Sequence, residues 1–282
     1  MSIECYFGPD FARLTMTGTL TPAMVLDMRR QFRIAVEYYR HDLIEIEIDS
    51  PGGDASALRA LTIEMEWLRA HGCAIRSTAM MQACSAAALT LAMGTVGMRT
   101  MQPYTHLLFH NARATPQGER PMTAIHAIAA AGELQRLDAE VVDMVVVHLA
   151  QARGGFRGLA IAGLNRCQTL KLEASTVVRE LGTEASISTA FGQKGKASKD
   201  KDRWIKSTIS AYEHVLSNDK AQAYTGLLAA LFALDDKMPS EMAWALQLID
   251  SVEGSSVLQP EVESKQIPED DASNSPSIRL AA

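Results

Sequence analysis

The feature that most constrains the fold is an alternation of strand and helix signals across the first 110 residues. Its clearest part is the run in which Ile44, Ile46 and Ile48 alternate with glutamates, because a period of two marks a strand with one buried face. That strand ends at the turn sequence Ser-Pro-Gly-Gly of residues 50–53, and the next residue, Asp54, is suited to capping a helix. We expect strands over residues 13–18, 44–48, 73–78 and 105–109, and helices over residues 22–38, 54–71 and 85–93. This order predicts an α/β fold with crossover connections between strands.

The second half of the chain is dominated by helix signals. Residues 121–151 form one long predicted helix, which Gly154 and Gly155 end. Residues 155–230 contain helical patches and few strand signals, and within them the charged segment 195–203 is expected to be an exposed linker. The last residues are rich in Ser, Pro, Glu and Asp, a composition typical of disorder. The chain therefore divides into an α/β core (1–154), a helical region (155–230), a segment that follows it (231–252) and a disordered tail (253–282).

Composition excludes several classes of protein. The chain has 282 residues, of which 47% are hydrophobic and 21% charged, and this excludes a collagen-like, coiled-coil or disordered chain. The net charge of −6 argues against a nucleic-acid partner, which would need a basic face. The four cysteines form no Cys-x-x-Cys pair and have no histidine at zinc-ligand spacing. We therefore expect a reduced, cytoplasmic protein with no metal and no cofactor.

One uncharged stretch, residues 77–98, is long enough to span a membrane. It consists mainly of Ala, Thr, Ser, Met and Gly and contains few Leu or Ile. We expect it to be a buried strand, turn and helix rather than a membrane span. The N-terminus carries acidic residues early and has no apolar signal-peptide segment, so no membrane partner is expected.

Three elements have the chemistry of a catalytic site. Gly52 and Gly53 allow the backbone at a strand end to approach a ligand closely and to aim an N–H group at it. Ser85 lies where a strand gives way to a helix, so it can present its hydroxyl beside unpaired helix N–H groups. His110, at the end of a strand, is the candidate base that activates Ser85, and His106 is its rival. Each element alone also has a simpler explanation: an ordinary turn, an N-cap serine or a structural histidine.

Taken together, these elements resemble the Clp protease proteolytic subunit family, the ClpP-like serine peptidases. The resemblance covers about residues 11–115 and is specific over two segments, 44–61 (IEIEIDSPGGDASALRAL) and 84–112 (CSAAALTLAMGTVGMRTMQPYTHLLFHNA). Within the second segment, several residues keep the family's register from Ser85 without a gap: Gly94, Gly97, Arg99, Pro103 and His110. The resemblance implies the ClpP/crotonase fold, a spiral of ββα units, with residues 155–230 as an α-helical insertion. This chain departs from the family at Met81, where a glycine is usual, and in about three extra residues between Gly53 and Ser85.

The resemblance also assigns roles to residues. It makes Ser85 the nucleophile, His110 the general base, and the backbone N–H groups of Gly53 and Ala86 the oxyanion hole. A triad needs a third group, which holds the imidazole in the correct tautomer.

The acid of the triad depends on how the family's last segment is aligned. Counting back from Asp250 places Asp235 at the acid position, with Asp236 beside it and Gln247 where the family has a glycine. A competing register, closer to His110, places Thr169 there and leaves the triad incomplete. The later register is preferred because it also explains the Leu-Ile-Asp-Ser-Val sequence that ends the segment 231–252, which then returns to the core.

The implied function is that of a serine endopeptidase, a hydrolase that cleaves peptide bonds by a Ser–His–Asp mechanism. Its partners would be peptides or unfolded proteins and further copies of the chain, contacted through helix 121–151, and an unfoldase is a further possible partner. Two alternatives remain open: a catalytically weak or inactive assembly or scaffold protein on the same fold, and a phage-type capsid-processing protease. Acyl-CoA chemistry of the crotonase type is a weaker alternative, since it does not need the Ser–His pair.

Overall fold

The structure is a computed structural model that describes residues 2–113, 123–181, 196–218, 221–233 and 237–260. Its sheet has the strand order β1-β2-β3-β4-β5-β7, and β6 pairs with β4 beside β5. The strands are β1 Ser2–Phe7, β2 Ala12–Thr17, β3 Leu43–Ser50, β4 Ala74–Cys84, β5 Arg99–Met101, β6 His106–Leu108 and β7 Ser251–Val252. Among these strands, β1 and β2 pair antiparallel and the other pairs are parallel. The expected α/β fold is confirmed, and the mostly parallel sheet is consistent with the ClpP/crotonase fold.

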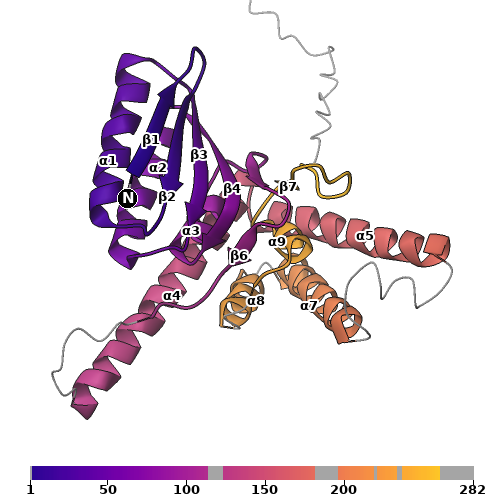
Figure 1. The fold of residues 1–282 in the computed structure, drawn as a ribbon. Helices are drawn as coiled ribbons and strands as arrows, with labels where there is room; N and C mark the ends of the chain where they lie inside the picture. Colours follow the sequence, from indigo (N-terminus) through magenta and orange to yellow (C-terminus); the bar gives the residue numbers. More distant parts are fainter. Residues whose placement is uncertain (1, 114–122, 182–195, 219–220, 234–236, 261–282) are drawn as a thin grey trace, which may run out of the picture.

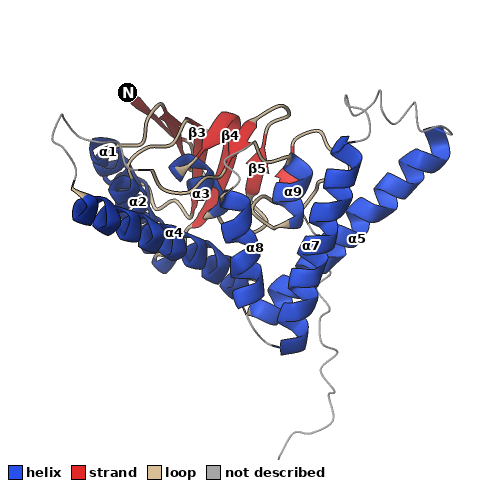
Figure 2. Cartoon of the chain, turned by 90° about the horizontal axis from the view of Figure 1, so that it is seen from below, coloured by secondary structure: helices blue, strands red, loops and turns tan. Residues whose placement is uncertain are grey.

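Helices cover one face of this sheet and extend to either side of it. Figure 1 shows α1 (Pro22–Arg33) and α2 (Ala55–Ala70) along the sheet, with a π-helical turn, Ile34–Tyr38, after α1. The remaining helices are α3 Ala86–Ala92, α4 Ala124–Ala152, α5 Phe156–Leu181, α7 Lys196–Asn218, α8 Gln222–Phe232 and α9 Ser240–Ala245. In Figure 2, α4 passes beneath the sheet and α8, while α5 and α7 lie together on the other side of the molecule. Within the described residues, none of the helices is both long enough and apolar enough to cross a bilayer.

The two faces of β3 show why the isoleucine repeat determines the packing. Ile44, Ile46 and Ile48 are 0% exposed and belong to the main hydrophobic core. On the opposite face, Glu45 accepts a hydrogen bond from Arg13 Nε at 2.8 Å and also pairs with Arg76. Alternate residues therefore go to an apolar and a charged face, as the period of two predicts.

The structure corrects several expectations about element boundaries. A strand, β1, precedes the first strand that we expected, and the short strands β5 and β7 were not expected at all. The strand expected over residues 73–78 continues to Cys84, because its second half pairs with β6 instead of β5. The segment 195–203 was expected to be an exposed linker, but residues from Lys196 onward are helical and form the start of α7.

The structure describes the first part of the segment that was expected to be disordered, residues 253–260. Leu258 is buried, its carbonyl accepts the Val252 N–H at 3.0 Å, and the Trp244 indole donates to the Gln259 carbonyl at 3.2 Å. Residues 253–260 therefore pack against the core, and the rest of the tail, 261–282, lies outside the described residues.

Candidate active site

Ser85 lies at the junction of β4 and α3 in an unusual backbone conformation. Its φ is +55° and its ψ is −126°, a region that side-chain-bearing residues rarely occupy. Two hydrogen bonds hold it there: the Ser85 N–H donates to the Leu108 carbonyl at 2.8 Å, and the Leu89 N–H donates to the Ser85 carbonyl at 3.1 Å. Strained backbone of this kind concentrates at functional sites, where the surrounding structure enforces it. Ser85 is half-buried, so its side chain is not sealed in the core.

The preceding residue, Cys84, does not compete with Ser85 as a nucleophile. Its side chain is buried, and this burial raises the pKa of the Cys84 thiol. Because the thiolate is the reactive form of cysteine, a raised pKa keeps Cys84 inert at neutral pH.

The turn after β3 lies directly against Ser85. Gly52 has a φ of +93°, and a Cβ atom added to it would lie 2.6 Å from the Ser85 Cβ and 2.5 Å from the Cys84 carbonyl oxygen. Only glycine meets both the conformational and the spatial requirement at this position. Gly52 therefore brings the backbone of the turn into contact with the serine, while Gly53 lies against the backbone of Leu20.

The directions of two backbone N–H groups follow from peptide geometry. In a planar trans peptide, the C=O and N–H groups point in opposite directions. The Gly52 carbonyl accepts the Leu20 N–H at 2.8 Å, so the N–H of Gly53, in the same peptide unit, points away from Leu20. The Ser85 carbonyl points along α3 toward Leu89, so the Ala86 N–H points back out of the helix. Among the described residues, neither N–H group donates to a protein oxygen, and both remain available to a ligand.

His110 follows β6, the strand that pairs in parallel with the end of β4. The register aligns Cys84 with Leu108, and the Leu108 carbonyl binds the Ser85 N–H, so His110 lies only two residues beyond that contact. His106, the rival base, is exposed and lies opposite Gln82, three residues before Ser85. The register therefore favours His110 over His106.

The tautomer of His110 follows from a hydrogen bond of its imidazole ring. Its Nδ1 lies 2.6 Å from the Asn111 carbonyl oxygen, which can only accept a hydrogen bond. Nδ1 therefore carries the proton, and Nε2 is left as an acceptor, which is the form a general base needs. The segment after His110 is held in turn by α4, because the Ala112 N–H donates to Asp138 Oδ1 at 2.5 Å.

The acid candidates Asp235 and Asp236 lie outside the described residues. The residues that follow them are described: Lys237 forms an antiparallel bridge with Leu108, and the Met238 N–H donates to the Leu107 carbonyl at 2.8 Å. The segment 237–238 therefore pairs with β6, the strand that leads to His110. The alternative position, Thr169, lies within the continuous helix α5, and its hydroxyl donates to the Asn165 carbonyl at 3.0 Å.

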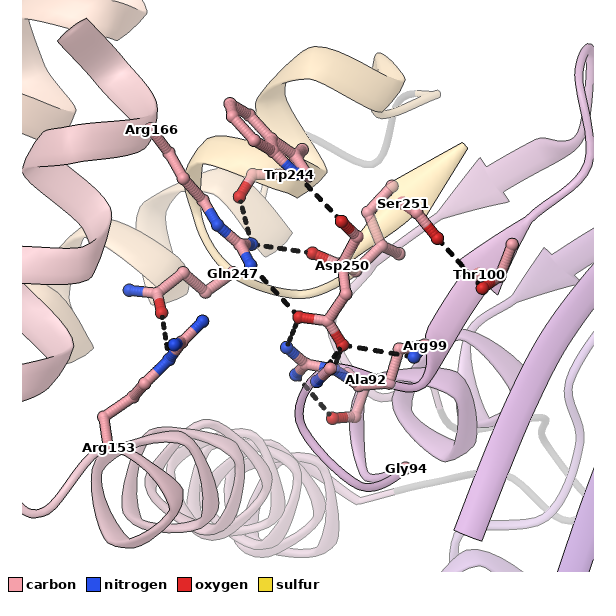
Figure 3. Close-up of polar contacts among 12 residues, drawn as sticks. Ala92, Gly94, Arg99, Thr100, Arg153, Arg166, Trp244, Gln247, Asp250 and Ser251 are labelled. Carbon is pink, nitrogen blue, oxygen red and sulfur yellow. Dashed lines mark hydrogen bonds and ion pairs between the residues drawn. The ribbon is translucent and has the colours of Figure 1, made fainter. Parts of the chain in front are cut away.

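Asp250, the residue used to set the register, forms a buried ion cluster with two arginines (Figure 3). Arg99 donates to both of its carboxylate oxygens at 2.7 Å, and Arg166 of α5 donates to one of them at 3.1 Å. The carboxylate also accepts the Gly97 N–H at 2.7 Å. Burial opposes the charge of Asp250, but the two guanidinium groups outweigh it and hold the pKa of this carboxyl well below its usual range. This cluster ties α5 to the sheet, so its role is structural.

Gln247 shows how the chain accommodates its departure from the family pattern. It has a φ of +59°, the conformation in which glycine is favoured. Its side chain is buried and donates to the Leu159 carbonyl at 2.7 Å. It also accepts from Arg153 Nε at 3.1 Å (Figure 3). These bonds to the α4–α5 region offset the backbone cost of a glutamine at this position.

Sequence reasoning missed the partners that hold this site. The Arg99–Asp250–Arg166 cluster joins residues far apart in the chain, and Leu20, which anchors the Gly52 carbonyl, lies in no recognisable motif. The sequence did contain a sign that Asp250 has a charged partner, since an aspartate directly after a buried apolar run has to be paired. Within the described residues, no group of three His, Cys, Asp or Glu side chains could hold a metal ion.

The mostly parallel sheet and the strand-to-helix junction at Ser85 point to a class, the ClpP-like proteins. Residues 16–157 match the family model described as Clp protease, and the chain belongs to that family. Among its relatives is a putative ATP-dependent Clp protease proteolytic subunit-like protein of Streptomyces coelicolor, 31% identical over 113 residues, which are 39% of this chain and 50% of the relative. Another is ATP-dependent Clp protease proteolytic subunit 4 of Streptomyces avermitilis, 35% identical over 106 residues, which are 37% of this chain and 44% of the relative. The chain thus spans about half the length of the curated relatives it matches.

Proposed function

We propose that this chain is a serine endopeptidase that cleaves peptide bonds by acyl transfer. Ser85 attacks the peptide carbonyl while His110 Nε2 takes the hydroxyl proton and then delivers it to the leaving amine. The N–H groups of Gly53 and Ala86 stabilise the negative charge on the tetrahedral intermediate, which is typically the largest single contribution to catalysis. Water then hydrolyses the acyl-enzyme, with His110 acting again as the base.

One observation carries this proposal: the strained Ser85 lies against a glycine turn, with two backbone N–H groups unused by the described protein. A serine that served only to cap α3 would bind a backbone N–H of the helix through its hydroxyl, but Ser85 makes no such bond. The pairing of β6 with β4 supports His110 as the base, because His110 follows by two residues the carbonyl that binds the Ser85 N–H.

We propose Asp235 as the third member of the triad. What supports it is the antiparallel bridge between Leu108 and Lys237. The Met238 N–H also donates to the Leu107 carbonyl, so the described residues that follow Asp235 in the sequence pair with the strand that leads to His110. The segment's ending, in which Asp250 is buried and β7 pairs with β5, supports the same register.

The chain is further proposed to work as a homo-oligomer that takes peptides or unfolded proteins as substrates. Helix α4 supports this, since its C-terminal half is buried through Val142, Val145 and Leu149 while its N-terminal half exposes Ile125 and Ile128. These two isoleucines are 77% and 73% exposed, and Figure 1 shows that this half of α4 projects away from the sheet. Exposed apolar side chains on a projecting helix are suited to contact with a second copy.

A second candidate, a catalytically weak assembly protein on the same fold, is favoured by the bond between His110 Nδ1 and the Asn111 carbonyl. A backbone carbonyl sets the tautomer but does not supply the negative charge that stabilises an imidazolium. Turnover of a fluorogenic peptide separates the two candidates. The peptidase predicts hydrolysis that is lost in Ser85→Ala but kept in Ser56→Ala, a control at an exposed serine of α2. Equal, negligible turnover by all three proteins favours the assembly protein.

A further inference from the structure

The turn that carries the proposed oxyanion donor contains one polar side chain without a role in the mechanism. Ser50 ends β3 and is 0% exposed. Its hydroxyl donates to the Gly18 carbonyl at 2.6 Å and accepts the Gly52 N–H at 3.1 Å. It therefore joins the loop after β2 to the glycine turn, in a place that no substrate reaches.

The orientation of the Gly53 N–H depends on the contacts that the glycine turn makes with Leu20, Ser50 and Ser85. The loop after β2 fixes the turn on its far side, because the Leu20 N–H donates to the Gly52 carbonyl at 2.8 Å and the Leu20 carbonyl accepts the Asp54 N–H at 3.0 Å. On its near side, Gly52 touches Ser85. The Ser50 hydroxyl is the only side-chain group among the described residues that binds the backbone of Gly52.

Loss of this hydroxyl would remove the partner of the buried Gly52 N–H and a donor to the half-buried Gly18 carbonyl. The turn would relieve this by rotating its peptide units toward other partners or water. Since the carbonyl of Gly52 and the N–H of Gly53 belong to one rigid plane, any rotation there also moves the oxyanion donor.

We propose that Ser50 is a positioning residue for the oxyanion hole: through the Gly52 N–H and the Gly18 carbonyl, it holds the Gly53 N–H toward the substrate carbonyl. This inference rests on the proposed peptidase function. Ser50 touches neither substrate nor the reacting atoms, so its effect is expected in the transition state rather than in substrate binding.

The test compares Ser50→Ala with Ser77→Ala in the full chain. Ser77 is an equally buried serine, 0% exposed, whose hydroxyl donates to the Leu91 carbonyl at 2.9 Å, far along β4 from the glycine turn. With a fluorogenic peptide, Ser50→Ala should lower kcat by about tenfold or more while KM changes by about twofold or less, since the loss of an oxyanion donor costs about 10²–10³ in kcat. Inhibition by a peptide aldehyde, which forms a tetrahedral adduct, should weaken in parallel. Ser77→Ala should change none of these quantities.

The results separate a failure of the role proposed for Ser50 from a failure of the peptidase function. If the wild type is active and Ser50→Ala behaves like Ser77→Ala, the role of Ser50 is refuted and the peptidase function stands. A rise in KM with kcat unchanged also refutes it, because it would place Ser50 in substrate binding. If the wild type neither hydrolyses the peptide nor binds the aldehyde, the peptidase function itself has failed. Should Ser50→Ala not fold, Ser50→Cys, which keeps a weak donor and acceptor, must show the same selective loss of kcat.

Discussion

Adding a methyl group at Gly52 tests the contact on which the proposed site depends. In Gly52→Ala, the new Cβ would lie 2.5 Å from the Cys84 carbonyl oxygen and 2.6 Å from the Ser85 Cβ, distances that real Cβ atoms do not tolerate. The φ of +93° adds a conformational cost of about 1–2 kcal/mol for a residue with a side chain. Overpacking typically costs a further ~1–3 kcal/mol. Together with the conformational cost, the expected loss of unfolding free energy is about 2–5 kcal/mol.

Activity should fall by more than this loss of stability explains, because the turn must move away from Ser85 and take the Gly53 N–H with it. We expect the rate of labelling by a fluorophosphonate to fall by about 10²–10³ at a temperature where the variant is folded. The matched control is Gly72→Ala, since Gly72 has a φ of +81° but no atom within 4 Å of an added Cβ. It should lose only about 1–2 kcal/mol in urea unfolding and label at the wild-type rate. Wild-type labelling by folded Gly52→Ala would refute the reasoning.

Three further perturbations test other parts of the account. Asp235→Asn should lower peptide turnover by about 10⁴ without unfolding the chain, as the loss of a triad carboxylate does elsewhere, and unchanged turnover would remove it from the triad. Burial lowers the pKa of His148 to about 4 from its usual 6.5, so the folded state resists a proton that the unfolded state accepts. Stability should therefore fall by about 3 kcal/mol between pH 7 and pH 4 in urea titrations, and His148→Gln should remove that part of the slope. Ile125→Glu combined with Ile128→Glu should convert an assembly into monomers of 30.6 kDa by light scattering, whereas an unchanged mass would place the contact elsewhere.

The part of the fold that was predicted correctly rests on local patterns with a physical cause. The alternation of Ile44, Ile46 and Ile48 identified β3 because each isoleucine has to be buried, and all three are. Thr21 and Pro22 marked the start of α1, where the Thr21 hydroxyl accepts the Met24 N–H at 3.2 Å. Such signals are contained within a few residues, so one sequence is enough to read them.

The elements that were missed depend on residues far away in the chain. β5 and β7 are three and two residues long, and β7 exists only because it pairs with β5 about 150 positions earlier. The segment 195–203 was interpreted as a linker because it is charged, but charge does not prevent a helix, and α7 begins at Lys196. No local sequence pattern distinguishes such short strands from loops, or a charged helix from a charged linker.

In the candidate site too, the sequence predicted some features and could not predict others. The sequence named Ser85, Gly53 and His110 as candidates; in the structure Gly52 touches Ser85, and β6, which leads to His110, pairs with the end of β4. The sequence could not show that Ser85 is strained, that Leu20 anchors the glycine turn or that Arg166 reaches Asp250, because these contacts arise only when distant segments pack together.

The central claim is that Ser85 is an activated nucleophile, and covalent labelling tests it most directly. A fluorophosphonate reacts with an activated serine, and intact-mass measurement counts the adducts on each chain. We expect one adduct per wild-type chain, none on Ser85→Ala, and strongly slowed labelling of His110→Ala because its base is missing. Equal labelling of the wild type and Ser85→Ala, or no labelling of the folded wild type, would contradict the claim.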